Sequence, residues 1–305
     1  TKAVNALSNY FKVTAYREGK EKTAEFERGV LIQEHKEIKT VEENGTLITF
    51  VPDDKIFKNF HFVQEYLDNQ FWNYCYLNAG LVMNLNNKRY VSKNGLLDLL
   101  QRKTNEDEIR YPIIHLKGND IELAFSHEND YGEEYYSFVN GQFTTQGGTH
   151  LAAFREGFVK TIREFYKKDY DSSDIRGSIC AALSVRVQEP VFESQTKTKL
   201  GSQTVYDGGP SMRNFIADFL GKELDNFLHK NPETAEALKK RIEQNERERK
   251  DMAGIKKLAN ERAKKANLHN KKLRDCKFHY NEEANGKDKY KIKKKKKEST
   301  IFITE

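Results

Sequence analysis

The residues best suited to chemistry lie in one polar loop, Ser194-Gln195-Thr196-Lys197-Thr198-Lys199. The loop follows a segment, 178–187, whose alternating apolar residues predict a half-buried strand. A lysine held on a loop after such a strand can place a positive charge on a phosphate, and a neighbouring amide or hydroxyl can fix the position of that phosphate. An ordinary solvated loop would have the same composition. The spacing therefore leaves both interpretations open.

The same loop belongs to a longer segment, 189–210, that shows no clear periodicity. A stretch of about 20 residues without secondary structure usually marks a functional loop in a compact domain. Pro210 closes the segment, and we expect it in the first turn of a following helix, where proline is favoured.

A second polar motif, Gln146-Gly147-Gly148-Thr149-His150, precedes a predicted helix over 151–166. Free N–H groups at a helix start can bind an anion. The same turn could instead supply positive φ at glycine and a threonine cap. His150 suits a structural hydrogen bond better than the role of general base. The paired acids Glu42-Glu43 and Asp53-Asp54 suit solvated turns, and the sequence contains no convincing Ser/His/Asp set, metal-ligand spacing or Walker-type phosphate loop.

The composition indicates a folded, highly charged protein. With 305 residues the chain is long enough for about two domains, and 37% hydrophobic residues exclude a disordered or collagen-like chain. No apolar run approaches the roughly 18 residues of a membrane span, so we expect no membrane partner. Cys75, Cys180 and Cys276 are far apart and fit neither a disulfide framework nor a zinc site, which favours a reducing cytoplasm.

The net charge of +6 is unevenly distributed. Residues 239–297 contain 23 Lys and Arg against 9 Asp and Glu, a net +14, which leaves −8 for the rest of the chain. A mildly acidic body with a basic arm points to a polyanion, first of all a nucleic acid. A solvated charged helix followed by a loose loop explains the same charges.

The periodicity predicts a mixture of helices and strands. Helices are expected over residues 1–11, 60–77, 151–166, 211–228 and from 231 to about 273. A hairpin is expected with strands 11–17 and 22–32, followed by a strand over 46–51 and a strand pair over 81–92. Residues 109–143 predict a three-stranded meander. A helix already running at residue 1 and a strand beginning at 301 suggest the middle section of a larger protein.

Seven motifs, in this order and spread over the whole chain, resemble the B subunits of bacterial type IIA topoisomerases, the DNA gyrase and topoisomerase IV proteins. They are AVNALS (Ala3–Ser8), GTLITF (Gly45–Phe50), YCYLNAG (Tyr74–Gly80), QGGTHLAAFREG (Gln146–Gly157), VQEPVFESQTKTKLGS (Val187–Ser202), KLRDC (Lys272–Cys276) and IFITE (Ile301–Glu305). The motifs that contain Gln146 and Gln195 are more similar to topoisomerase IV.

The resemblance implies an α+β architecture. Residues 1–94 would form the C-terminal half of a GHKL-type ATPase domain. Residues 95–275 would form the transducer domain, with a ribosomal-protein-like α/β fold and a long C-terminal helix. Residues 276–300 would be a basic linker, and residues 301–305 the first strand of a TOPRIM domain.

The resemblance also implies site residues. Lys197, with Gln195, matches the QTK loop that reaches the γ-phosphate of ATP, a catalytic role similar to that of an arginine finger. Thr46 matches the threonine of the adenine pocket, and Arg17 an arginine at the pocket rim. Thr1 would offer its backbone N–H to the phosphates.

Other features of the family bear on the metal. Glu305 stands in the position of the metal-linked TOPRIM glutamate, so the expected cofactors are ATP and Mg²⁺. The family's catalytic glutamate base, its Mg²⁺-binding asparagine and its adenine-binding aspartate would lie upstream of Thr1, and the TOPRIM Asp-x-Asp site beyond Glu305. Lys199 is interpreted as a solvated or DNA-facing residue, and Lys293–Lys297 as a linker or a DNA contact.

Taken together, the resemblance implies an ATP-dependent type II DNA topoisomerase in which an ATP-operated clamp drives the passage of duplex DNA. The partners implied are double-stranded DNA, the topoisomerase A subunit in a heterotetramer, and a second copy of the chain that dimerises on ATP binding, in the nucleoid-associated cytoplasm. The alternative is a non-catalytic coupling and DNA-binding module that acts through the basic arm. A chaperone or mismatch-repair GHKL protein is disfavoured by the Gln195–Lys197 loop and the TOPRIM-like ending.

Overall fold

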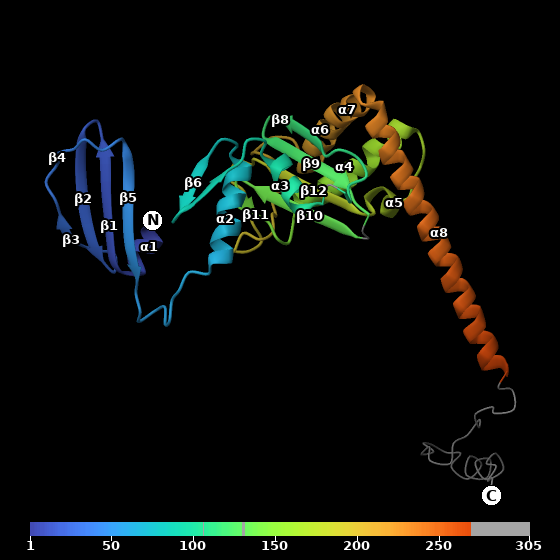
Figure 1. Ribbon diagram of the computed structural model, residues 1–305, viewed down its shortest axis with the longest axis horizontal. Coiled ribbons are helices and arrows are strands. Elements are labelled where there is room, and N and C mark those ends of the chain that lie inside the picture. The colour runs from blue at the N-terminus through green and yellow to red at the C-terminus, as the bar shows by residue number, and fades with distance from the viewer. Residues whose placement is uncertain (106, 130–131, 270–305) are drawn as a thin grey trace, which may run out of the picture. The chain divides into compact units, whose positions relative to one another are not determined.

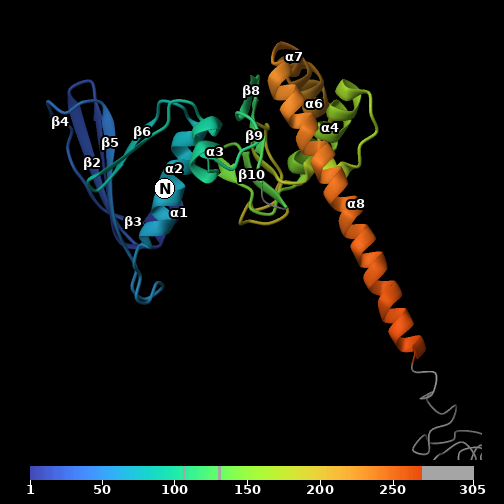
Figure 2. The same ribbon diagram turned by 45° about the vertical axis from the view of Figure 1, so that its right-hand side comes forward.

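The computed structural model describes residues 1–105, 107–129 and 132–269, with the side chains of the last helix described up to residue 263. It divides into two units, shown in Figure 1 and Figure 2. Unit 1 contains Thr1–Tyr74 and Met83–Tyr90, and unit 2 contains Cys75–Val82 and the described residues from Val91 on. The predictions for the KLRDC motif, the basic linker and Glu305 fall outside the described residues.

Unit 1 is built on an antiparallel sheet in the order β3-β2-β1-β5, with the short β4 (Ile38–Lys39) also paired to β2. Its strands are β1 (Ser8–Arg17), β2 (Lys20–Glu27), β3 (Val30–Glu34) and β5 (Gly45–Pro52). The predicted turn between β1 and β2 is confirmed, because Glu18 and Gly19 both have positive φ (53° and 75°), as a two-residue hairpin turn requires.

Two predictions in unit 1 are wrong in extent. The first helix, α1, covers only Lys2–Ala6, because the Ser8 hydroxyl bonds back to the Val4 carbonyl (2.6 Å) and the chain then pairs with β5. The predicted return strand is two strands, since Arg28 and Gly29 (φ 48° and 83°) form a second tight turn. Tertiary pairing overrides helix periodicity in short segments.

The helix predicted from residue 60 begins later, as α2 (Gln64–Leu77). The rings of Phe57, Phe60 and Phe62 pack edge to face on one another in the non-helical segment before it, with centroids 6.1 and 5.0 Å apart. The predicted strand pair is confirmed as β6 (Val82–Leu85) and β7 (Lys88–Val91), a separate two-stranded sheet.

Unit 2 contains a five-stranded mixed sheet in the order β11-β10-β12-β9-β8. The strands are β8 (Ile114–Gly118), β9 (Ile121–His127), β10 (Glu133–Val139), β11 (Gln142–Phe143) and β12 (Ile179–Val185). The long helix α4 (Thr149–Tyr166) lies in the connection from β10 to β12, which run parallel, so these three elements form a βαβ unit.

The predicted meander is therefore wrong, because β12 is inserted between β9 and β10. The prediction that this strand is half-buried is also wrong. Ile179, Ala181 and Leu183 lie on the face toward α4, and the residues between them, Cys180 and Ala182, are equally buried on the other face. A strand buried on both faces belongs in the middle of a sheet.

The two faces of this sheet are covered by different helices. Phe154 and Phe158 of α4 pack on Tyr135 and Phe125, with ring centroids 6.2 and 5.1 Å apart. On the opposite face lies α3 (Leu96–Lys103), which contacts β12 and β9 and buries Leu96, Leu99 and Leu100. The sheet is thus a rigid base for the loops at its ends.

The C-terminal helices follow the loop at 189–210. Helix α6 (Met212–Phe219) runs through one π-helical turn, η1 (Leu220–Leu224), into α7 (Asp225–Lys230). Ser211 is the N-cap of α6, with its hydroxyl accepting from Asn214 N–H (3.2 Å), so the prediction that places Pro210 inside the first turn is wrong.

A long helix, α8 (Pro232–His269), begins one residue after the predicted start at 231 and stands out from unit 2 in Figure 1. Ala235, Leu238 and Ile242 near its start are buried in the unit 2 core, whereas residues 250–263 are exposed. No described helix combines the length and apolar character that crossing a membrane requires.

Two fully buried histidines make the stability of unit 2 depend on pH. His127 accepts from the Tyr111 hydroxyl and donates to the Ile175 carbonyl (2.8 Å), and burial lowers its pKa to about 4. His150 donates to Thr144 Oγ1 (3.1 Å), and burial likewise lowers its pKa to about 4. Both side chains are therefore neutral in the folded protein near neutral pH.

We expect acidification from pH 7 to pH 5 to lower the free energy of unfolding by about 2 kcal/mol for each histidine, because the unfolded chain takes up a proton near pH 6.5 and the folded chain only near pH 4. Denaturant titrations at several pH values check this. His150→Gln should remove about half of the pH dependence, and the exposed-site control His61→Gln should leave it unchanged. A pH dependence that is the same in all three proteins would contradict the assignment.

Candidate functional site

The loop that contains Lys197 is a short hairpin. Phe192 and Leu200 face each other as an antiparallel bridge, and Glu193 N–H donates to the Lys199 carbonyl (3.0 Å). Nearer the loop base, Gly201 N–H donates to the Val191 carbonyl (2.8 Å). Residues 194–198 therefore form the tip of a fixed hairpin, which the sequence could predict only as a segment without periodicity.

Lys197 and Gln195 lie at this tip with exposed side chains. Lys197 has positive φ (56°), and its N–H donates to the Ser194 carbonyl (3.0 Å), which closes a tight turn. The Ser194 and Thr196 hydroxyls bond to each other at 2.7 Å. Within the described residues, the Lys197 ammonium makes no ion pair or hydrogen bond, so its charge is available to an anion. A non-glycine residue in the left-handed region often marks a functional position.

Lys199 makes an ion pair that the sequence does not predict. Its ammonium lies 2.9 Å from Glu193 Oε1, across the base of the hairpin, while its side chain remains 42% exposed, as a solvated residue would be. The pair compensates the charge of Lys199 and leaves Lys197 as the cation that the hairpin presents. The sequence places both lysines in one loop. Only the pairing of the two hairpin arms shows that Lys197 lies at the tip and Lys199 at the base.

The Gln146–Thr149 turn contacts the hairpin. Three of its four N–H groups donate to backbone carbonyls: Gln146 to Thr198 (3.0 Å), Thr149 to Leu200 (3.1 Å) and Gly147 to Thr144 (2.9 Å). Both glycines have positive φ, as expected, but the N-cap of α4 is Gly148 and not a threonine.

The residues expected to bind nucleotide in unit 1 lie on its sheet and first helix. Thr46 of β5 is paired with Ala15 of β1, and Arg17 ends β1 with an 85% exposed side chain that contacts Glu18. Thr1 precedes α1, which packs where β1 begins, so it lies at the other end of that strand from Arg17. Gln195 and Lys197 belong to unit 2.

Asp53 is not the solvated turn residue that the sequence predicts. Its side chain is 3% exposed, accepts from Arg28 Nε (2.6 Å) and from Lys55 N–H (3.0 Å), and these donors hold its pKa below the usual value. The pair joins the β2–β3 turn to the end of β5. Spacing along the chain offers no signal for it, because the two partners are 25 residues apart.

Sequence reasoning also missed a basic groove on unit 2. The groove has a volume of about 960 Å³ and lies over α4, α6 and the start of α5 (Ser172–Arg176). The cationic side chains of its lining are Arg155, Lys160, Arg163, Arg176 and Arg213, against the acids Glu156 and Glu164. Arg155 and Arg176 share one carboxylate, that of Glu133. The eight-residue spacing of Arg155 and Arg163, two turns of helix, is the signal that could have revealed it.

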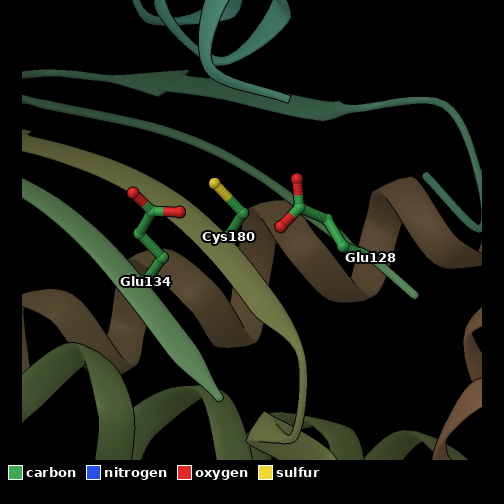
Figure 3. Close-up of side chains that lie close together, drawn as sticks. All are labelled: Glu128, Glu134 and Cys180. Carbon is green, nitrogen blue, oxygen red and sulfur yellow. The ribbon is translucent and has the colours of Figure 1, made fainter. Parts of the chain in front are cut away.

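Figure 3 shows a third group, in which Glu128, Glu134 and Cys180 point toward one another with ligand atoms within 4.8 Å. Burial and the two carboxylates raise the pKa of the Cys180 thiol to about 12. Among the residues with described positions, no second feature indicates a bound cation, and we assign this cluster no metal.

Comparison with known proteins shows which family the chain resembles. A family model described as DNA gyrase B matches residues 89–258. The B subunit of DNA topoisomerase 4 from Borreliella burgdorferi is 42% identical over 305 residues, which is 100% of this chain and 48% of that protein. The B subunit of DNA gyrase from Cytophaga aurantiaca is 31% identical over 265 residues, which is 78% of this chain and 54% of that protein. The chain thus spans about half the length of these relatives.

Solved structures share the fold. The 43K ATPase domain of Thermus thermophilus gyrase B, in complex with an aminocoumarin, has a TM-score of 0.67 at 24% identity, covering 83% of this chain and 73% of that one. The topoisomerase IV ATP-binding domain of Francisella tularensis has a TM-score of 0.63 at 24% identity, covering 81% and 71%. The predicted α+β fold class with a long C-terminal helix is confirmed. Because the family match covers more than half of its length, the chain belongs to the DNA gyrase B family.

Proposed function

We propose that this chain is part of the B subunit of an ATP-dependent type II DNA topoisomerase, in which Lys197 binds the γ-phosphate of ATP. The observation that carries the proposal is the exposed Lys197 ammonium, free of partners among the described side chains, at the tip of a fixed hairpin in a chain of this family. A compact ammonium on a rigid turn suits a phosphate oxygen, because it supplies a full positive charge at a set position.

The remaining site residues are assigned by the same proposal. Gln195, exposed at the same tip, donates its amide to the phosphate, while the Thr1 N–H, Arg17 and Thr46 bind the rest of the nucleotide. ATP, when bound with Mg²⁺, supplies the phosphoanhydride bond that is cleaved. Lys197 then stabilises the negative charge that develops on the γ-phosphate.

The proposal extends to the domain organisation and the partners. Residues 1–94 are assigned to the ATPase domain, 95–275 to the transducer, 276–300 to a linker and 301–305 to the first TOPRIM strand, in which Glu305 is a Mg²⁺ ligand. Two copies of the chain dimerise on ATP binding and join two A subunits in a heterotetramer. Such an enzyme acts on double-stranded DNA in the nucleoid-associated cytoplasm.

The basic groove supports DNA as the substrate. Its lining on α4, α5 and α6 holds five cationic side chains against two acidic ones. Each cation also contacts a carboxylate: Arg155 and Arg176 that of Glu133, Lys160 that of Glu164, Arg163 that of Asp169 and Arg213 that of Glu156. Phosphate contacts of this kind supply most of the sequence-independent affinity for DNA. The groove would therefore contact the DNA backbone without selecting a sequence.

The second candidate function is the non-catalytic coupling and DNA-binding module. It is favoured by the exposed half of α8, residues 250–263, which carries Lys250, Lys256, Lys257 and Arg262 against Asp251 and Glu261. In that case DNA affinity would depend on this helix, and ATP would make no difference to the DNA product.

The proposal is tested with the full-length protein combined with its A subunit. We expect strand passage on plasmid DNA, seen as a change in linking number or as decatenation on a gel, with ATP and not with ADP, because only ATP carries the phosphate that Lys197 binds. Equal strand passage with ADP, or none with either nucleotide, would contradict the proposal. Retained DNA binding without any ATP-dependent product would favour the second candidate.

A further inference from the structure

The hairpin that presents Lys197 is bonded to one short turn of unit 2, and its residues Phe192 and Leu200 also pack in the unit 2 core. Its second arm runs parallel to the Gln146–Thr149 turn, with Gly148 and Leu200 bridged. Three backbone hydrogen bonds join the two segments, from Gln146 to Thr198 (3.0 Å), from Leu200 to Gly147 (3.0 Å) and from Thr149 to Leu200 (3.1 Å). The first of these bonds reaches the residue directly after Lys197.

From these contacts we propose that Gly148 and Thr149 are positioning residues for Lys197: they set where its ammonium lies, without touching the nucleotide. The inference rests on the proposed role of Lys197 at the γ-phosphate. This inference gives the turn a function that the sequence did not suggest. From the sequence, the turn could be interpreted only as an anion site or as a helix cap.

Gly148 allows the two backbones to approach closely. Its φ is 136°, and a Cβ atom added there would lie 2.4 Å from the Leu200 oxygen and 2.5 Å from the Leu200 nitrogen. Atoms this close cannot be accommodated by rotating a side chain, since both belong to the backbone. Any side chain at this position must therefore push the hairpin away from the turn.

Thr149 adds a bond from its side chain. Its hydroxyl donates to the Ser202 carbonyl at 2.6 Å, which fixes the base of the hairpin two residues beyond Leu200. A hydroxyl on a β-branched residue at the start of a helix has few rotamers, so little freedom is lost when the bond forms.

The turn itself is firmly anchored, because it continues into α4. His150 in the first turn of that helix is fully buried and bonded to Thr144, and Phe154 and Phe158 follow in the sheet core. The Glu193–Lys199 pair closes the hairpin on its other side. Lys197 lies three residues before Leu200, which is bonded to the turn at the start of α4. The position of Lys197 therefore depends on the position of α4.

The position of the Lys197 ammonium affects kcat, because a group that stabilises a transition state must lie at the developing charge. A displacement of about 1 Å in a catalytic group can lower the rate on the order of 100-fold. We expect Gly148→Ala in the full-length protein, with its A subunit, to lower kcat for ATP by about 100-fold. Thr149→Val should lower it by about 3- to 10-fold, the usual range for one hydrogen bond.

The matched controls use the same kinds of change away from the contact. Gly208→Ala places alanine at another positive φ (71°) in the same long loop, where nothing lies within 4 Å, and should leave kcat unchanged. Thr149→Ser keeps the hydroxyl and should restore kcat to near the wild-type value. If Gly148→Ala does not fold, Thr149→Val and Thr149→Ser still form a complete test.

A second readout separates positioning from general structure. We expect Gly148→Ala and Thr149→Val to lose the preference for a non-hydrolysable ATP analogue over ADP, while the Kd for ADP and the melting temperature with ADP stay near wild type. Loss of ADP binding in parallel, or unchanged kcat in both variants, would overturn the inference. Lys197→Ala is measured beside them: if it has full turnover, the proposed function fails, whereas if it alone is impaired, only the positioning role fails.

Discussion

Replacing Lys197 with alanine lowers kcat for ATP hydrolysis by about 10³-fold in the full-length protein, if this lysine stabilises the charge on the γ-phosphate. The magnitude is at the lower end of what a cation contributed from a loop adds in phosphoryl transfer. It is expected to be large because, among the described residues, Lys197 is the lysine at the hairpin tip, whereas Lys199 lies at the hairpin base beside Glu193 (2.9 Å).

Steady-state kinetics with and without DNA measure this effect, and the Kd for ADP distinguishes catalysis from folding. ADP lacks the γ-phosphate, so its affinity should change by less than about 2-fold. Lys222→Ala, which removes an exposed lysine on η1, is the matched control and should keep full turnover. If Lys197→Ala hydrolyses ATP at the wild-type rate, the hairpin has no catalytic role.

Replacing Arg249 with methionine lowers the free energy of unfolding of unit 2 by about 2–3 kcal/mol. The Arg249 guanidinium donates two hydrogen bonds to the Asp174 carboxylate, from Nε at 2.7 Å and from Nη2 at 2.8 Å. The Asp174 side chain is only 2% exposed, so removing the arginine leaves a buried carboxylate without its partner. The value is set below the usual 3–5 kcal/mol because the Arg249 side chain is 45% exposed.

Chemical denaturation followed by circular dichroism measures this change. Lys250→Met is the control on the same helix: it removes an exposed i,i+4 pair with Glu246 and should cost less than about 0.5 kcal/mol. The double variant Asp174→Asn, Arg249→Met should regain part of the loss, because a neutral amide is less costly to bury than a charge. A loss in Arg249→Met no greater than that in Lys250→Met would show that the pair does not hold α8 on α5.

The sequence alone determined those parts of the protein that depend on neighbouring residues. The periodicity of residues 151–166 predicted α4, and the alternation on either side of residues 18–20 predicted the first hairpin. The polar loop around Lys197 offered a phosphate-binding lysine as one of two interpretations, and seven motifs in order indicated the family that the comparisons confirm. Periodicity, turn chemistry and motif order are local, so a single sequence carries them.

The tertiary structure decided everything that depends on pairing between distant segments. It placed β12 between β9 and β10, since a strand buried on both faces needs two neighbours. It also buried Asp53 against Arg28, paired Lys199 with Glu193, and attached the hairpin to Gly148. These contacts form because buried polar groups and backbone N–H groups need hydrogen-bond partners, and the fold decides which groups lie within reach. The spacing of residues along the chain does not identify those partners.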